Sequence, residues 1–247
     1  MKILHRYILV INLCLIGLGS AFAQENQGVV VEEPLETRTS DTLVDQNPTE
    51  KYGLRAGIDL SKILRSFLED NYEGAAILGD FRIKDRYYIA AEIGRETKSF
   101  DEAIFDAKTQ GTYLKGGINY NAYNNWAGMS NLIYVGFHIG VSSFKTDLNQ
   151  YTIYNPNNFF EPDVRTVSRE YSGLNAIWGE LQMGIQVEVL NNLYLGMNVQ
   201  LKRMLSQKAP DDFTNIYAPG FNKITFDNVY GAGYGYSISY LLPIFKK

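Results

Sequence analysis

Cysteine is almost absent from this sequence of 247 residues, since Cys14 is the only one and lies in an apolar segment near the amino terminus. Histidine is nearly as scarce, and His138 is the only imidazole outside the same amino-terminal region. Once that region is removed, no disulfide framework can form, and a zinc site lacks its usual ligands. The sequence therefore predicts neither a metal nor a cofactor.

Long hydrophobic runs are also missing after the amino terminus, which excludes membrane-spanning helices of about 18 or more apolar residues. The apolar run from Ile8 to Leu18 is too short to span a membrane. It follows Lys2 and Arg6 and precedes the small-x-small triplet Ala21-Phe22-Ala23. This order is typical of a secretory signal peptide, so we predict that residues 1–23 are cleaved off near Ala23.

Positive charge is in the minority, with 23 Lys and Arg against 27 Asp and Glu. This balance argues against a nucleic-acid partner. The most acidic stretch is 24–50, where seven carboxylates face the single cation Arg38. Low hydrophobicity combined with net charge predicts that this stretch is a disordered periplasmic tail.

A period of two is what the sequence does contain. Between Leu174 and Met204, apolar residues take one parity and polar residues the other, and the turn signal Leu190-Asn191-Asn192 divides the stretch. Successive side chains leave opposite faces of a strand, so the pattern predicts a β-hairpin. The same pattern predicts six more strands, at residues 52–60, 75–83, 86–95, 109–121, 131–143 and 229–245.

The predicted connections alternate between long and short. Outer-membrane barrels have short periplasmic turns and long external loops, and strands of about ten residues cross the bilayer when tilted. We therefore expect four long connections to be external. They are residues 61–74, where Ile63, Leu64, Phe67 and Leu68 have the spacing of a short helical turn, and residues 96–108, 144–173 and 205–228.

Glycine indicates which face of the strands lies inside. The polar parity carries eleven glycines and the apolar parity three. The concave side of a small barrel is crowded and favours small residues, so the polar face should line the lumen and the apolar face should meet lipid. Residues 51–247 are thus predicted to form an all-β, eight-stranded antiparallel up-and-down transmembrane β-barrel in the outer membrane. A soluble periplasmic ligand-binding barrel would need the two faces inverted.

Charged residues on the polar face should pair with one another, because an isolated buried charge is costly. In the hairpin, paired residue numbers should sum to about 382, which predicts a salt bridge between Glu180 and Lys202. The expected lumen network consists of Arg55, Asp59, Asp80, Arg82, Glu92, Lys115, Glu180, Glu188 and Lys202. Aromatic residues at the predicted periplasmic strand ends should form an interfacial girdle, made of Tyr52, Phe81, Tyr87, Tyr120, Tyr240 and Phe245.

Four stretches of the chain resemble one family. They are KYGLRAGIDLSKILRSFLEDNYEG, GMSNLIYVGFHIG, LQMGIQVEVLNNLYLGMNVQLKRMLSQKAPDDF and the ending YSISYLLPIFKK. They are similar to an uncharacterised family of Gram-negative outer-membrane barrels, described as a domain of unknown function. The resemblance covers Lys51 to Lys247. It implies an outer-membrane barrel and supplies no activity and no catalytic residues.

The sequence favours a structural or interaction role, with outer-membrane lipid and an extracellular or periplasmic protein as partners. Two alternatives stay open. His138 and Ser142 share the inward parity, and with a carboxylate they are candidate catalytic residues of a lipid-modifying enzyme. A hydrogen-bonded lumen histidine is the simpler interpretation. The other alternative is a small channel, although eight strands leave no wide pore.

Overall fold

The structure is a computed structural model that describes residues 51–84, 86–123, 131–153, 163–225 and 228–246. The predicted signal peptide and acidic tail lie outside these residues. Residues 46–247 make up one compact unit, and its architecture is described here.

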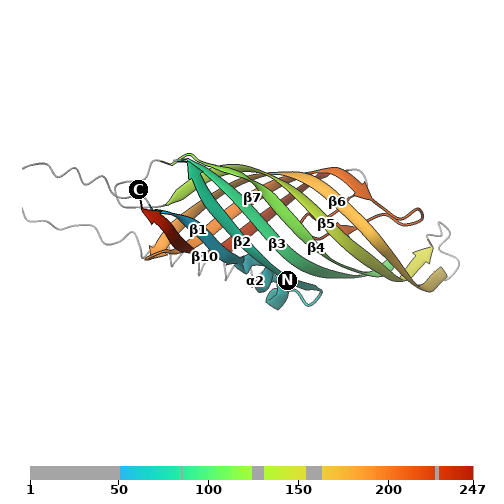
Figure 1. Ribbon diagram of the computed structural model, residues 1–247. Helices are drawn as coiled ribbons and strands as arrows, with labels where there is room; N and C mark the ends of the chain where they lie inside the picture. Colours follow the sequence, from blue (N-terminus) through green and yellow to red (C-terminus); the bar gives the residue numbers. More distant parts are fainter. Residues whose placement is uncertain (1–50, 85, 124–130, 154–162, 226–227, 247) are drawn as a thin grey trace, which may run out of the picture. The chain divides into compact units, whose positions relative to one another are not determined.

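Eight antiparallel strands close into a barrel in the order β1-β10-β7-β6-β5-β4-β3-β2, in which each strand pairs with its neighbours along the chain and β10 closes on β1 (Figure 1). This confirms the predicted eight-stranded up-and-down barrel. The strands are β1 (Lys51–Asp59), β2 (Tyr72–Lys84), β3 (Tyr87–Glu102), β4 (Phe105–Asn121), β5 (Leu132–Ile153), β6 (Asp163–Leu190), β7 (Leu193–Lys208) and β10 (Tyr230–Lys246). Two short strands, β8 (Tyr217–Ala218) and β9 (Asn222–Lys223), form a separate hairpin.

The two faces of the barrel wall differ as the parity predicts. On β5, the Phe137 side chain points outward and is 59% exposed, whereas the adjacent His138 points inward and is 7% exposed. The same alternation runs along the other strands, so the outer surface is an apolar band and the lumen is polar. The inverted arrangement of a soluble ligand-binding barrel is therefore wrong. No helix within the described residues is both long and apolar enough to cross a membrane.

Strand register in the β6–β7 hairpin agrees with the sequence. Glu180 pairs with Lys202 and Gln182 with Gln200, so the numbers of paired residues sum to 382 through the middle of the hairpin. The register shifts near the turn, between Glu188 and Leu190, without affecting these pairs.

The strands are longer than the sequence pattern predicts, and the predicted loops are correspondingly shorter. Residues 96–108 are mostly strand, because β3 and β4 continue to a turn at Ala103 and Ile104. The expected loop at 144–173 is largely the end of β5 and the start of β6, which reach 22 and 28 residues. Beyond the lipid both faces of a strand meet water, so the alternation that reveals strands fades while the backbone ladder continues.

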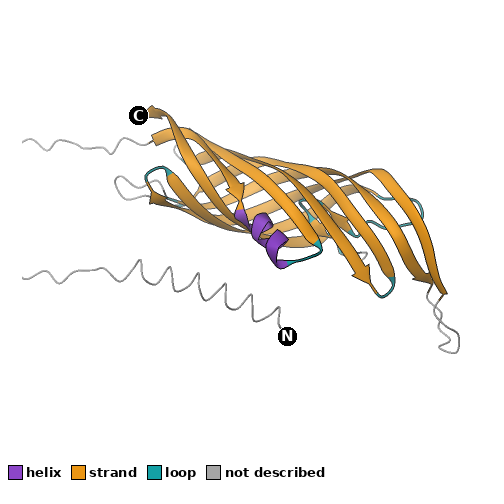
Figure 2. Cartoon of the chain, turned by 90° about the horizontal axis from the view of Figure 1, so that it is seen from below, coloured by secondary structure: helices purple, strands orange, loops and turns teal. Residues whose placement is uncertain are grey.

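A helix replaces part of one strand in the barrel wall. α2 (Leu60–Leu68) confirms the helical spacing, but it does not lie in an external loop as expected. β1 stops at Asp59, whose carboxylate accepts a hydrogen bond from Ser61 N at 2.9 Å and caps the helix. β2 and β10 extend past that level, and α2 packs against both of them (Figure 2). The helix therefore occupies the place in the wall that a longer β1 would fill.

Candidate functional site

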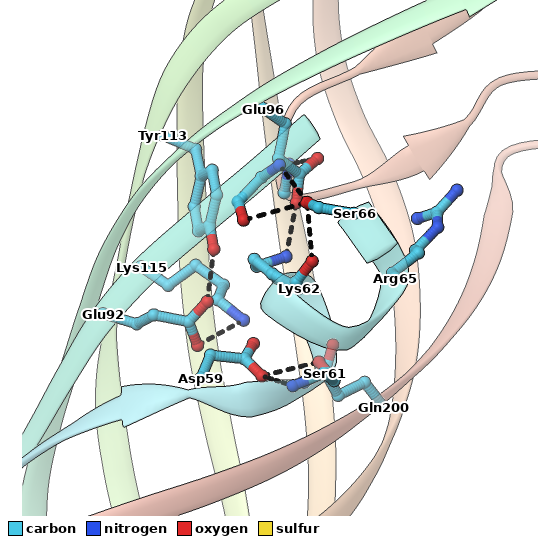
Figure 3. Close-up of polar contacts among 12 residues, drawn as sticks. Asp59, Ser61, Lys62, Arg65, Ser66, Glu92, Glu96, Tyr113, Lys115 and Gln200 are labelled. Carbon is cyan, nitrogen blue, oxygen red and sulfur yellow. Dashed lines mark hydrogen bonds and ion pairs between the residues drawn. The ribbon is translucent and has the colours of Figure 1, made fainter. Parts of the chain in front are cut away.

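The inner face of α2 meets a group of buried charges in the lumen (Figure 3). Lys62 of the helix forms an ion pair with Glu96 of β3, which is fully buried. Glu96 also accepts hydrogen bonds from Tyr217 Oη at 2.6 Å and from Gly220 N at 3.0 Å. Burial, together with the nearby Glu96 carboxylate, raises the pKa of Tyr217 well above its ordinary value, so the hydroxyl remains a donor. One carboxylate thus joins α2, β3 and the β8–β9 hairpin.

A second part of the same group lies one layer deeper. Lys115 Nζ lies 2.9 Å from Glu92 Oε2 and 3.5 Å from Glu180 Oε1. Tyr113 Oη donates a hydrogen bond to Glu92 at 2.5 Å (Figure 3). Lys202 Nζ lies 3.9 Å from Glu180 Oε2, so Glu180 is shared between two lysines and lies closer to Lys115.

Three of these cations, Lys62, Lys115 and Lys202, line a cavity of about 270 Å³ between α2 and β10, called here the chamber. Inward-facing Lys115 and Lys202 line it, and so do Ala232 and Tyr234, whose side chains lie on the outer face of β10. The chamber therefore reaches through the wall along α2. Its charged lining consists of Asp59, Lys62, Arg65, Glu69, Lys115 and Lys202.

A separate ion pair lies toward the end of the barrel that carries the short turns. Arg55 Nη2 lies 2.5 Å from Asp80 Oδ1, and the guanidinium sits 5.0 Å and 5.2 Å from the ring centroids of Tyr88 and Tyr194. The adjoining cavity, lined by polar and apolar residues alike, has a volume of about 60 Å³. A water needs about 10–15 Å³ by this measure, so a few waters fit but a substrate does not.

The β8–β9 hairpin folds into the lumen and fills the half opposite the short turns. Its turn needs glycine, because Gly220 has a φ of +79°. Phe221 is 1% exposed and makes an edge contact with Trp178 at a centroid distance of 6.0 Å. The predicted external loop at 205–228 is thus wrong for its central part, which is a plug. The buried apolar cluster formed with the wall comprises Ala76, Tyr113, Phe144, Leu174, Ala176, Trp178, Met204, Ala218, Phe221 and Ile224.

Six of the nine predicted lumen charges lie in the two groups already described, and the other three have different roles. Asp59 caps α2. Glu188 accepts a hydrogen bond from Asn192 N at 2.8 Å and so braces the β6–β7 turn. The Arg82 guanidinium lies 5.9 Å from the Tyr88 ring centroid.

Sequence reasoning missed the contribution of Lys62 and Glu96. The alternation pattern places both in external loops, although two signals in the sequence point inward. Glu96 continues the parity of Glu92, and Lys62 shares a helical face with Ser61 and Arg65. The missed residues are those that connect the lumen charges to the helix.

His138 and Ser142 lie on the inward face of β5, but the structure does not join them. His138 Nε2 is hydrogen-bonded to Asn119 Oδ1 at 2.8 Å. Ser142 Oγ is buried without a hydrogen-bond partner among the described residues. A serine nucleophile needs a base within hydrogen-bond reach. The arrangement fits a lumen histidine held by an amide better than a catalytic pair.

Four of the six aromatic residues expected at the membrane interface lie at one end of the barrel, beside the short turns. Tyr87 and Tyr120 are paired across β3 and β4, and their ring centroids are 5.4 Å apart. Phe81 and Tyr240 are also exposed on the outer face. The side chains of Tyr52 and Phe245 lie outside the described part of the structure.

Comparison with solved structures finds proteins of low sequence identity. The attachment invasion locus protein Ail of Yersinia pestis aligns with a TM-score of 0.38 and 7% identity, over 77% of this chain and 97% of Ail. CarO2 of Acinetobacter baumannii aligns with a TM-score of 0.38 and 12% identity, over 79% of this chain and all of CarO2. No curated protein sequence matches the chain. The sequence model of the family described as "Domain of unknown function (DUF6048)" matches residues 4–247, and the chain therefore belongs to that family.

Proposed function

We propose that the protein is a small outer-membrane barrel with a sealed, charge-paired lumen and that it has a structural or interaction role at its outer rim. The observation that carries this proposal is the filled lumen. The β8–β9 plug occupies the half opposite the short turns, and the buried ion pairs of Lys115 and Arg55 cross the remainder beside the chamber and the cavity of about 60 Å³. An eight-stranded barrel has little room beyond its own side chains.

The outer rim is the surface left for a partner. On β5 the continuous run of apolar outward residues ends at Val141, and the outward positions that follow include Lys145 and Asp147, before Tyr151 and Ile153 at the tip of the strand. The strand nevertheless continues to Ile153, paired with β6. The β5–β6 ribbon, like that of β3 and β4, therefore extends beyond the apolar band and presents polar side chains to the exterior.

Contacts at the rim hold this ribbon against the start of the β7–β10 connection. Lys145 Nζ lies 2.6 Å from Glu170 Oε2 across the ribbon. Arg169 forms an ion pair with Asp212, and the rings of Tyr171 and Phe213 stack at 5.7 Å. An ordered, mixed-charge rim of this kind suits recognition of an extracellular protein, which we propose as the partner beside outer-membrane lipid.

The test is to purify the full chain from outer membranes and to insert it into a planar bilayer. We expect resistance to carbonate extraction, a gel mobility that changes on heating, and no conductance steps. A variant with Tyr217–Lys223 replaced by a Gly/Ser linker of equal length serves as the comparison, because it removes the plug. Discrete conductance steps from the wild type would overturn the sealed-lumen proposal in favour of a channel.

A further inference from the structure

The chamber has an opening that faces lipid. α2 presents Leu64 and Phe67 outward, and Phe67 is 82% exposed. On its other side, β10 contributes Ala232 and Tyr234 to the chamber wall. No backbone ladder joins α2 to β10, since the pairing of β1 with β10 ends at Ser237. The seam between the helix and the strand is thus a lateral route from the membrane into the chamber.

This opening lies at the depth of lipid headgroups. Charges begin to appear on the outward face of the wall at this level, where Glu73 on β2, Arg95 on β3 and Arg203 on β7 are exposed beside apolar residues such as Leu205 and Tyr230. An amphipathic helix with an apolar outer face is stable at the boundary between headgroups and acyl chains. A lipid beside α2 therefore holds its phosphate near the chamber.

The lining of the chamber carries four cations and two carboxylates. The carboxylates behind it already have neutral donors: Tyr113 Oη binds Glu92, Tyr217 Oη and Gly220 N bind Glu96, and Trp178 Nε1 binds Glu180 at 3.4 Å. These neutral donors satisfy part of the hydrogen-bonding capacity of the three carboxylates, which the lysines would otherwise have to satisfy alone. The cations are therefore left with hydrogen-bonding capacity.

Lys202 shows this most clearly. Its side chain is 3% exposed, and its ammonium donates one hydrogen bond within the described structure, to Gly220 O at 2.7 Å. Glu180 lies at 3.9 Å, beyond hydrogen-bond distance. An ammonium has three donors, so two of them remain for another acceptor. Arg65 contributes a guanidinium that donates to Glu69 through Nε at 2.9 Å and stacks on Tyr72 at 3.9 Å.

We propose that the chamber binds the phosphate-bearing headgroup of a membrane lipid that enters between α2 and β10. The acyl chains stay outside, against Leu64, Phe67 and Tyr234, while Arg65 and Lys202 hold the phosphate. Phosphate oxygens accept strong charge-assisted hydrogen bonds from both side chains. The proposal rests on the membrane setting proposed above and adds a ligand to it.

The experiment is native mass spectrometry of the full chain in neutral detergent, titrated with phosphatidylglycerol, diacylglycerol or inorganic phosphate. We expect one retained phosphatidylglycerol per barrel and no retained diacylglycerol. Arg65→Gln and Lys202→Gln should each weaken retention about tenfold, the equivalent of one charge-assisted hydrogen bond. The matched control is Arg203→Gln, which removes an exposed cation of the outer face and should leave retention unchanged.

Three results would overturn the proposal. If Arg203→Gln weakened phosphatidylglycerol retention as much as Arg65→Gln or Lys202→Gln does, surface charge alone would attract the lipid. Displacement of phosphatidylglycerol by an equimolar amount of inorganic phosphate would assign the chamber to free phosphate instead. Unchanged retention in Arg65→Gln, which is only half-buried and so least disturbs folding, would exclude the site. Failure of the outer-membrane proposal is seen separately, as release of the wild type by carbonate.

Discussion

Glu180 is the residue whose replacement tests the electrostatics of the lumen most directly. Its carboxylate is fully buried and lies between Lys115 Nζ at 3.5 Å and Lys202 Nζ at 3.9 Å. Glu180→Gln keeps the size of the side chain and removes its charge. Lys115 then still has Glu92 at 2.9 Å, whereas Lys202 retains only its hydrogen bond to a backbone carbonyl.

The expected magnitudes follow from which charge is left uncompensated. Removing one partner of a buried ion pair costs about 3–5 kcal/mol, and we expect about 3 kcal/mol for Glu180→Gln because Lys115 keeps one carboxylate. Lys202→Met should cost less, about 2 kcal/mol, because Glu180 keeps Lys115. The double variant leaves Lys115 and Glu92 as a balanced pair. The free energy of unfolding of the double variant should fall by about 3 kcal/mol. This is about 2 kcal/mol less than the sum of the two single losses, and the difference is the coupling energy.

The assay is reversible urea unfolding of the barrel in micelles, with the free energy of unfolding measured for the wild type, both single variants and the double variant. The control cycle uses Gln182→Leu and Gln200→Leu, the next inward pair along the same two strands. No ionic charge is present there, so its coupling should stay below about 1 kcal/mol. Strictly additive losses for Glu180 and Lys202 would show that the two charges do not interact and would refute the reasoning.

Two further predictions concern the helix and the plug. Ser66 Oγ accepts a hydrogen bond from Gly74 N at 2.8 Å at the edge of β2. Ser66→Ala should therefore lower the free energy of unfolding in urea by about 1–3 kcal/mol. The control Ser206→Ala, at an exposed position of β7, should leave it almost unchanged. An unchanged free energy of unfolding in Ser66→Ala would mean that the helix does not support the strand edge. Trypsin added to whole cells should cut after the exposed Lys208 and spare the bond after Lys223, because Lys223 is paired with Tyr217 and the next residue, Ile224, is buried. Early cutting after Lys223 would show that the plug leaves the lumen.

The sequence predicted those features that depend on a face touching lipid. Strand number, closure, the inward parity and the pairing of Glu180 with Lys202 all follow from strict alternation across an apolar band. The long extensions of β5 and β6 were not predicted, because outside the band neither face needs to be apolar. The plug was missed for a related reason: Phe221 and Tyr217 lie in a polar stretch, and only the tertiary fold reveals that they are buried.

The α2 segment determines both the local structure of the barrel wall and the position of the cations that line the chamber. In a strand, Lys62 and Arg65 would leave opposite faces, because their numbers differ by three, and one cation would point into lipid. In a helix, residues three and four apart share a face, so Lys62, Arg65 and Ser66 all lie on the inner side while Leu64 and Phe67 lie on the outer side. Near the headgroups an outward-facing charge costs about 0–1 kcal/mol, so this placement of the cations favours the helix over a continued β1 by a small amount. The helix cannot extend the backbone ladder to β10, and the lateral opening to the chamber is therefore a direct consequence of where this segment places its cations.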